Sequence, residues 1–250
     1  MKIAVYTANF GGKDIIRDPL NYRISDTIDY FVISDNNTQS TSAYQLVYKK
    51  SQFDDVAKNA RYYKILGFEI FTDYDYLIWH DANIQIRHDA VSKLIQYVSD
   101  GEHMAVFKHP ERDSFYQEAR SCIQLDKDFS LKILFQAFVY FVKGLPKNSG
   151  LFETGILVRK TAAINVPLYD TWWHNIQKYT RRDQLALPFI KWKYKSKIAI
   201  LPGRGISNEF SQYHPHLHRN YYIKRDLMRY NSRFLKAVCS KFIKFFESAR

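Results

Sequence analysis

Short apolar runs alternate with helix-like segments along the first 160 residues of the chain. The runs have the length of buried strands, and they lie at residues 2–7, 30–33, 76–79, 104–107 and 155–158. Between them, residues 56–71 and 89–98 carry apolar side chains at helical spacing. Strands that alternate with helices predict an α/β fold with a mostly parallel sheet.

Polar side chains follow three of these strands at the point where each one ends. Thr7 and Asn9 close the first run, Asp35 follows the second, and residues 80–83 follow the third. In open α/β sheets, ligands bind beyond the carboxyl ends of the strands. We therefore expect these three polar clusters to face one ligand-binding crevice.

The third cluster contains a candidate metal site. In extended backbone, Asp81 and Asn83 point to the same side, so their side-chain oxygens can converge. Such oxygens are the ligands that Mg²⁺ and Mn²⁺ prefer. The alternative is an ordinary turn, in which Asp and Asn bind the nearby backbone. The motif by itself leaves both interpretations open.

Three further polar residues are candidates for catalysis. Glu153 precedes the fifth strand, where a carboxylate can bind sugar hydroxyls or act in acid–base chemistry. The alternative for Glu153 is a solvated acid beside a glycine turn. Asp183 and Gln184 are adjacent, and their alternative is the first turn of a helix, where an acid is favourable.

Two pairs of residues are candidates for binding an anionic substrate. Lys58 and Arg61 lie one helical turn apart and form a possible phosphate clamp. His109 and Arg112 follow the fourth strand, where Arg112 can bind a carboxylate or phosphate and His109 can donate a hydrogen bond to substrate. The alternative for both pairs is a solvated surface.

His214, His216 and His218 place three of the eight histidines within five residues. No cysteine lies nearby and the H-E-x-x-H spacing is absent, so a three-histidine zinc site is disfavoured. One histidine that completes an oxygen-rich metal site is the preferred interpretation, and a surface loop without a ligand role is the alternative. The two cysteines, Cys122 and Cys239, are too few for a disulfide framework.

Composition indicates a globular protein with an excess of positive charge. Hydrophobic residues make up 46% of the chain, but no apolar run approaches the roughly 20 residues of a membrane-spanning helix. The first residues do not resemble a signal peptide, so we expect a soluble cytoplasmic protein. The net charge of +12 favours anionic partners, such as a nucleotide-linked substrate or phospholipid. No nucleic-acid motif is present, and we expect no specific nucleic-acid partner.

The basic excess is concentrated at the end of the chain. Residues 219–250 contain nine of the 37 basic residues and only two of the 25 acidic ones. One apolar stripe at helical spacing runs through this segment, formed by Leu227, Phe234, Val238, Phe242 and Phe245. An apolar stripe flanked by basic residues predicts that residues 226–247 form a helix lying on an anionic membrane. The alternative is that this stripe packs against the rest of the protein.

Several motifs occur together in a characteristic order. They are Y-T-A-N-F-G-G-K-D, D-Y-F-V-I-S-D-N, K-N-A-R-Y-Y-K-I-L, Y-D-Y-L-I-W-H-D-A-N-I-Q-I, H-P-E-R-D-S-F-Y-Q-E-A, E-T-G-I-L-V-R and R-R-D-Q-L-A-L-P. Over residues 1–215, this order resembles the glycosyltransferase-like domain family of plant mucilage proteins and bacterial polysaccharide gene clusters. More distantly, it is similar to glycogenin-like retaining glycosyltransferases of the GT-A fold.

The resemblance implies an organisation and an activity. It implies a GT-A-like domain over residues 1–218, followed by a basic amphipathic helix over residues 219–250. It also implies transfer of a sugar from a nucleotide-diphosphate sugar to a saccharide or lipid-linked acceptor, in bacterial surface polysaccharide synthesis. Retention of anomeric configuration is favoured by the glycogenin-like relatives. The alternatives are a sugar-nucleotide hydrolase, or an inactive transferase fold that binds RNA or a membrane. For an enzyme with a lipid-linked acceptor, the membrane expected to contact residues 226–247 is the inner face of the cell membrane.

Carried over position by position, the resemblance also implies residue roles. Around the nucleotide and the donor phosphates it places Tyr6, Thr7, Asn9, Asp35, Lys58 and Arg61. Near the donor sugar and its reacting carbon it places Glu153, Asp183 and Gln184. Asp81 and Asn83 stand where related enzymes have D-x-D and bind Mn²⁺ or Mg²⁺, and His214, His216 or His218 supplies the last ligand. Asn83 replaces the second aspartate of that motif, which lowers the negative charge of the site.

Overall fold

The computed structural model describes residues 1–37, 41–98, 101–216 and 230–250. It divides the chain into two compact units. The first consists of the described parts of Met1–Phe107, Glu153–Tyr169 and Lys197–Arg219. The second consists of the described parts of Lys108–Phe152, Asp170–Ser196 and Asn220–Arg250.

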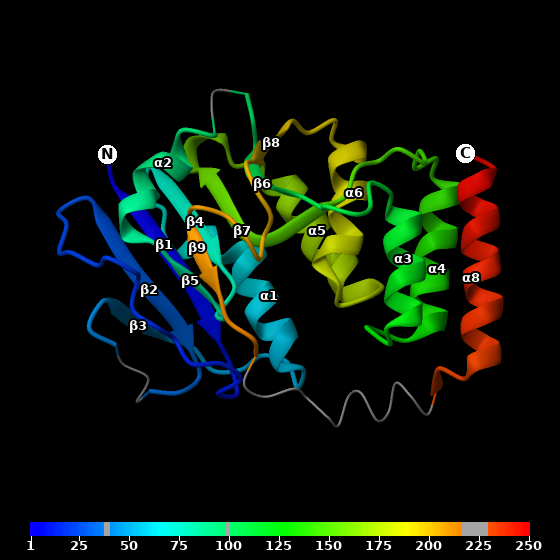
Figure 1. Ribbon diagram of the computed structural model, residues 1–250, viewed down its shortest axis with the longest axis horizontal. Helices are drawn as coiled ribbons and strands as arrows, with labels where there is room; N and C mark the ends of the chain where they lie inside the picture. The colour runs from blue at the N-terminus through cyan, green and yellow to red at the C-terminus, as the bar shows by residue number, and fades with distance from the viewer. Residues whose placement is uncertain (38–40, 99–100, 217–229) are drawn as a thin grey trace. The chain divides into compact units, whose positions relative to one another are not determined.

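The first unit is built on a seven-stranded sheet with the order β3-β2-β1-β4-β7-β6-β8 (Figure 1). The strands are β1 (Ile3–Asn9), β2 (Ile28–Ser34), β3 (Tyr44–Tyr48), β4 (Tyr76–His80), β6 (Met104–Lys108), β7 (Phe152–Lys160) and β8 (Ile198–Leu201). Neighbouring strands β3, β2, β1 and β4 are parallel, as are β6 and β8, whereas β7 runs antiparallel to β4. The predicted mostly parallel α/β sheet is confirmed.

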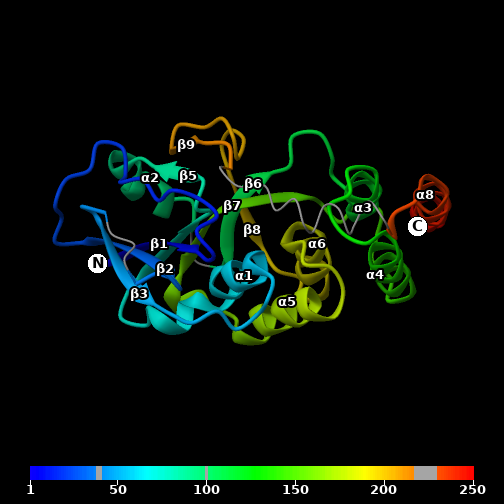
Figure 2. The same cartoon turned by 90° about the horizontal axis from the view of Figure 1, so that it is seen from below.

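Both faces of this sheet are covered, which explains why its central strands read as continuous apolar runs. One face packs on α2 (Val91–Ile95) and on the small sheet of β5 (Ile84–Ile86) and β9 (Ser211–Tyr213). The other carries α1 (Val56–Leu66) and the 3₁₀ turn η1 (Gly67–Ile70) (Figure 2). Two further 3₁₀ turns are η2 (His88–Ala90) and η3 (Thr161–Ala163).

All five predicted strands and both predicted helical segments are present. The first predicted helix ends at Leu66 and continues as η1, and the second is shortened to η2 and α2. The sequence analysis did not identify β3, which lies at one end of the strand order, or the short strands β5, β8 and β9. Short strands and strands at a sheet edge have weak apolar patterns, because part of their surface faces water.

A buried arginine holds together the face of the sheet that carries α1. Arg159 of β7 is fully buried, donates a hydrogen bond to the Ile65 carbonyl oxygen at 3.1 Å and binds the Tyr6 hydroxyl. Its guanidinium also lies 5.4 Å from the ring centre of Tyr169 and 6.0 Å from that of Phe68. Among the described residues, the Arg159 guanidinium is surrounded by these neutral oxygens and aromatic rings, and its Nε has no hydrogen-bond partner.

The second unit is helical. It contains α3 (Phe115–Gln124), α4 (Ser130–Val142), most of α5 (Val166–Lys178), α6 (Asp183–Lys193) and α8 (Arg233–Ser248). Two ion pairs hold α8 in place. Glu247 of α8 binds Arg120 of α3, and Lys236 of α8 binds Asp126, which follows α3. Asn231, just before α8, accepts a hydrogen bond from the Ser130 backbone NH at 2.8 Å and so caps the start of α4.

Helix α8 carries two neighbouring apolar stripes, and only one of them is packed. Cys239, Ile243 and Phe246 are buried, and the Phe246 ring stacks on Phe141 of α4 at 5.0 Å between ring centres. The stripe that the sequence singled out lies one residue earlier at each turn, and Phe234, Phe242 and Phe245 are exposed. The alternative that this stripe packs against the protein is therefore wrong for these three residues. Leu227 and the predicted boundary at residue 218 lie outside the described residues.

Within the described residues, no helix is long and apolar enough to cross a membrane.

Removing the Arg159 side chain is expected to destabilise the first unit strongly. Arg159→Ala leaves a cavity and deprives the Tyr6 hydroxyl and the Ile65 carbonyl of their donor, so the free energy of unfolding should fall by about 3 kcal/mol or more. Urea-induced unfolding measures this change. The control is Arg87→Ala, because the Arg87 side chain is only half-buried and pairs with the exposed Asp89 at 3.5 Å, and its cost should stay within about 0.5 kcal/mol. Equal midpoints for the two variants would contradict the role given to Arg159.

Candidate functional site

The strand order creates a switch point between β1 and β4. From β1 the chain builds outward through β2 and β3, whereas β4 lies on the other side of β1. β1 and β4 are parallel, with Tyr6 beside Trp79, so their carboxyl ends emerge at the same edge of the sheet. Ligands of open α/β sheets bind at such a point. Asn9 ends β1 and Asp81 directly follows β4, as the sequence analysis expected.

Asp81 is held in position by a buried cation. Its Oδ1 lies 3.2 Å from Lys64 Nζ and accepts a hydrogen bond from Trp79 Nε1 at 3.0 Å. Lys64 is buried, and its ammonium also donates to Thr154 Oγ1 at 3.1 Å. The Asp81 side chain remains 41% exposed. The result is an oriented carboxylate that solvent or a ligand can reach at the end of a central strand.

The backbone after Asp81 is a turn, not the extended segment that the sequence analysis assumed. The Ile84 NH donates to the Asp81 carbonyl oxygen at 2.8 Å, which closes the turn. The Asn83 side chain donates through Nδ2 to the His214 carbonyl oxygen at 2.9 Å, and the His214 NH donates to the Asn83 carbonyl at 2.9 Å. The turn thus joins Asn83 to His214, one of the three histidines expected to supply the last metal ligand.

Strand β7 brings a second set of groups to the same edge. The Asp81 NH donates to the Gly155 carbonyl oxygen at 2.8 Å, which extends the β4–β7 pairing by one residue. A Cβ at Gly155 would lie 2.8 Å from Ile84 Cδ1, so a larger residue here would require the end of the Ile84 side chain to shift. Two residues earlier, Glu153 Oε2 accepts a hydrogen bond from the Gly205 NH at 2.7 Å. Glu153 is therefore held by the loop after β8 and is not simply solvated.

The three candidate histidines have different surroundings. His214 Nε2 lies 3.0 Å from Gln85 Oε1, and burial, with a further contribution from Arg17, lowers the pKa of His214. A lowered pKa favours the neutral imidazole, the form that binds metals. His216 is 2.9 Å from Asp14 and so pairs with a different carboxylate. His218 lies outside the described residues.

The groups present at this edge fit a divalent cation only in part. Of the expected ligands, Asp81 and Asn83 lie in the turn after β4, and the His214 backbone pairs with Asn83 while its imidazole contacts Gln85. The described residues contain no group of three or more His, Cys, Asp or Glu side chains arranged to hold a metal ion. A cation at Asp81 would therefore need oxygen ligands from a bound substrate, as Mg²⁺ commonly does with phosphates.

The residues expected around a nucleotide divide into two groups. Tyr6 and Thr7 are buried inside β1, and the Tyr6 hydroxyl binds Arg159, so the expectation that they contact the donor does not fit their positions. Asn9 and Asp35 lie at strand ends and shape the loop after β1. Asn9 Nδ2 donates to the Asp14 carbonyl at 2.7 Å, and Asp35 Oδ1 accepts from the Gly11 NH at 3.0 Å.

The cation that the structure places at the site is not one of the two that the sequence analysis chose on α1. Lys58 Nζ lies 5.1 Å from the ring centre of Phe53, and Arg61 Nη1 is 3.5 Å from the Ala57 carbonyl. Lys64 lies one turn beyond Arg61 and is the residue that contacts Asp81. The burial of Lys64 could have been predicted from the sequence, because Lys64 is surrounded by the apolar residues Tyr63, Ile65 and Leu66.

In the second unit, His109 and Arg112 form a network with each other. Arg112 Nη2 lies 2.9 Å from His109 Nε2, and Arg112 Nε donates to Glu118 Oε2 at 2.8 Å. The His109 Nδ1 accepts hydrogen bonds from the backbone NH groups of Glu111 and Arg112. The solvated loop that was the alternative is wrong for these two residues, and their contact with a donor stays a prediction.

Asp183 and Gln184 begin α6, which agrees with the alternative of a helix N-terminus. Asp183 is buried, and its backbone carbonyl oxygen accepts a hydrogen bond from Trp172 Nε1 at 3.2 Å. Gln184 Nε2 donates at 3.2 Å to the carbonyl of Phe152, the residue that precedes Glu153. That Asp183, Gln184 and Glu153 meet at one donor sugar stays a prediction.

His80 is a buried residue that contacts the backbone of Asp81. It is the last residue of β4, and it is buried with Nε2 2.9 Å from the Tyr44 hydroxyl and Nδ1 3.2 Å from the Asp81 carbonyl. Burial lowers the pKa of His80 from 6.5 to about 4. The imidazole is therefore neutral at physiological pH and acts as a fixed hydrogen-bonding spacer between β3 and the turn at Asp81.

With this geometry in place, comparison with known proteins defines the family. A model of the TOD1/MUCI70 glycosyltransferase-like domain family matches residues 1–202, and the chain belongs to this family. The "probable hexosyltransferase MUCI70" of Arabidopsis thaliana is 21% identical to the chain over 220 residues. That match covers 78% of this chain and 38% of the plant protein, so the chain spans well under half the length of this relative.

A solved glycosyltransferase structure shares the fold. The apo structure of the bifunctional glycosyltransferase WbbM matches with a TM-score of 0.50 and 11% identity, covering 80% of this chain and 39% of that one. The apo form of mouse xyloside xylosyltransferase 1 matches with a TM-score of 0.45 and 8% identity, covering 80% and 84% of the two chains. At such low identity the likeness concerns the fold alone, and the predicted GT-A-like fold is confirmed.

The Lys64–Asp81 pair is expected to behave as a buried ion pair. Asp81→Asn leaves the Lys64 ammonium buried without its counter-charge, so the free energy of unfolding should fall by about 2 kcal/mol. Adding Lys64→Met removes the stranded charge and should recover most of that loss. The control is Glu209→Gln at the exposed Lys93–Glu209 pair, which should cost less than about 1 kcal/mol. A double variant no more stable than Asp81→Asn would contradict the coupling.

His80 is expected to make folding stability depend on pH. Its pKa is about 4 in the folded protein and about 6.5 in the unfolded chain, so below pH 6.5 the unfolded state binds a proton that the folded state does not. The stabilisation is complete above pH 6.5 and is lost as the pH falls towards 4. Between pH 7.5 and pH 5.0 the loss should be about 2 kcal/mol. Urea unfolding of wild type and His80→Gln at both values measures it, and identical pH dependence in the two proteins would refute it.

Proposed function

We propose that this chain transfers a hexose from a nucleotide-diphosphate sugar to a hydroxyl of a saccharide or lipid-linked acceptor, in the synthesis of a surface polysaccharide. Membership of the TOD1/MUCI70 family and the GT-A-like fold support the class of reaction. The single observation that carries the proposal is Asp81, a partly exposed carboxylate held by Lys64 and Trp79 at the switch point of the sheet.

The chemistry of the reaction explains why these groups suit the site. Negative charge develops on the nucleotide diphosphate as the bond to the sugar breaks, and positive groups fixed in advance stabilise it. A divalent cation, Mn²⁺ or Mg²⁺, bound at Asp81 would neutralise that charge. Asp81, Asn83 and His214 are the residues that would hold it. Lys64 keeps the Asp81 carboxylate in one orientation and limits its movement.

Glu153 is proposed to bind hydroxyl groups of the donor sugar. Its carboxylate is positioned by the Gly205 NH, so it can accept hydrogen bonds without first losing conformational freedom. Asp183 and Gln184 are proposed, on the family resemblance, to lie near the reacting carbon. An oxocarbenium-like transition state is stabilised by nearby carboxylate or amide oxygens. Retention of configuration is part of this proposal.

The donor can be identified by ligand-induced stabilisation. Thermal shifts are measured for the full chain with UDP, GDP, CMP, ATP and RNA oligonucleotides, each with Mn²⁺ and with EDTA. Stabilisation by one nucleoside diphosphate that requires the metal supports the transferase proposal. Stabilisation only by oligonucleotides would contradict it. Sugar nucleotides of the selected base are then incubated with candidate acceptors, and products are detected by mass spectrometry. Release of free sugar at the same rate with and without an acceptor would instead identify a hydrolase.

Loss of the Asp81 charge is expected to abolish transfer. The Lys64→Met/Asp81→Asn double variant should lose at least 100-fold in kcat/KM, because removal of one preorganised electrostatic group costs about that much. This double variant is preferred to Asp81→Ala, which strands a buried ammonium and confuses activity with stability. Asn83→Asp is the matched comparison and should retain metal-dependent turnover. A stable double variant with near-normal kcat/KM would remove Asp81 from the site.

A further inference from the structure

The second unit exposes an unusual amount of large apolar surface. Helices α4 and α8 lie side by side (Figure 1). Both carry a row of exposed large apolar side chains. We call these seven residues the aromatic face: Leu131, Phe135, Phe138, Val142, Phe234, Phe242 and Phe245. Each of them is between 48% and 79% exposed. Contiguous apolar patches on a protein surface mark interaction sites, whereas scattered single residues do not.

The rows on the two helices form one continuous surface. The Phe246 ring lies 6.1 Å from that of Phe138 on α4 and 6.2 Å from that of Phe245 on α8, so it links the two rows. Phe246 is itself buried between the helices. The aromatic face is therefore the common outer surface of a packed helix pair, and exposing it requires no unfolding of either helix.

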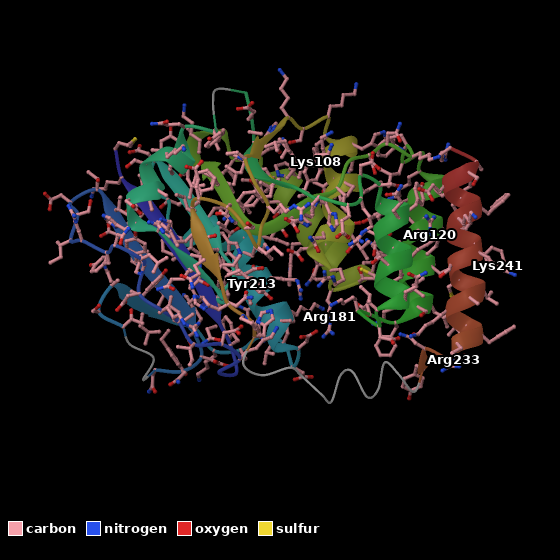
Figure 3. All side chains as sticks on the ribbon, in the orientation of Figure 1. Lys108, Arg120, Arg181, Tyr213, Arg233 and Lys241 are labelled. Carbon is pink, nitrogen blue, oxygen red and sulfur yellow. The ribbon has the colours of Figure 1, made fainter. Side chains whose placement is uncertain are left out.

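The charges around the aromatic face have a single sign. Helix α4 contains one charged residue, Lys132, which is exposed. On α8, Arg233, Lys241 and Lys244 are exposed, and Lys241 extends away from α4 (Figure 3). The single carboxylate of α8, Glu247, is buried and paired with Arg120. The two helices thus offer apolar groups and free cations and no exposed carboxylate.

We propose that the aromatic face docks the protein on a bilayer that contains anionic lipid, with α8 still packed against α3 and α4. Lys241 and Lys244 alternate with Phe242 and Phe245 along α8. This spacing allows phenyl rings to enter the acyl boundary while the ammonium groups stay among the lipid phosphates. The surface differs from the predicted membrane helix of residues 226–247, because α4 contributes more than half of its residues.

Charge argues against a second copy of the chain as the occupant. A two-fold symmetric dimer would place the same surface on itself, so Lys132, Arg233, Lys241 and Lys244 would face an identical set of cations. With no exposed carboxylate on either helix, that contact has no complementary charge. An anionic bilayer supplies both the apolar interior and the opposite charge.

The test is co-sedimentation of the full chain with vesicles of phosphatidylcholine alone or with 30% phosphatidylglycerol. Binding is expected only to the anionic vesicles and should weaken at high salt, because salt screens the attraction. Phe135→Ser/Phe242→Ser/Phe245→Ser should lower the partition coefficient at least tenfold. Lys241→Gln/Lys244→Gln should lower it about fivefold for each charge, the equivalent of about 1 kcal/mol.

A matched control separates this face from apolar exposure in general. Ile24 and Ile206, in the first unit, are 91% and 63% exposed, and Ile24→Ser/Ile206→Ser should bind vesicles as wild type does. Equal binding by the phenylalanine variant and this control would overturn the proposal, as would equal binding to both vesicle types. A dimer in sedimentation velocity that the phenylalanine substitutions abolish, without vesicle binding, would overturn it in favour of self-association.

Cys239 reports whether α8 stays docked. Cys239 lies on the packed side of α8, where it is buried, and in a Cys122→Ser background it is the sole cysteine. Maleimide labelling should remain slow in the presence of anionic vesicles, since the proposed contact uses the neighbouring exposed stripe of the helix and leaves Cys239 packed. Slow labelling of Cys239 in the phenylalanine variant also verifies that this variant is folded. Rapid labelling on vesicles would show that α8 detaches and would overturn the docked arrangement.

Discussion

The antiparallel pairing of β4 with β7 is the constraint on which the candidate site depends. In a sheet whose other central strands are parallel, the reversed strand brings its first residues to the edge where β4 ends. Thr154 and Gly155 therefore lie beside Asp81, although more than 70 residues separate them in the sequence. At its opposite end the same strand carries Arg159, so one element links the interior of the first unit to its ligand-binding edge.

Two buried cations on one face of this sheet are compensated in different ways. Arg159 is surrounded by a carbonyl, a hydroxyl and aromatic rings, and its delocalised charge tolerates such neutral partners. Lys64 has a compact charge and is paired with the carboxylate of Asp81 and the hydroxyl of Thr154. The first arrangement stabilises the core. The second orients a carboxylate that remains within reach of a ligand, which is the property a transfer site requires.

In the helical unit, a few polar contacts decide which side of α8 is packed and which side is exposed. Polar contacts at both ends of α8, from Asn231 and Lys236 at its start and Glu247 at its end, fix which side of the helix faces α3 and α4. Phe234, Phe242 and Phe245 then remain outside, even though burying them would be favourable in water. A contiguous exposed apolar surface marks an interaction site, and the surrounding cations favour the anionic partner that we propose.

The sequence by itself determined the α/β class, the five main strands and the position of Asp81 at a strand end, because buried strands leave a local pattern of apolar residues. It did not determine that Lys64, not Lys58 or Arg61, meets Asp81, since that choice depends on how α1 rotates against the sheet. Nor did it determine that residues 81–84 form a turn, since that turn depends on the pairing of Asn83 with His214 from far along the chain. On α8, two apolar stripes one residue apart have almost the same spacing. Only the packing of α3 and α4, whose contacts come from far along the chain, decided which stripe was buried.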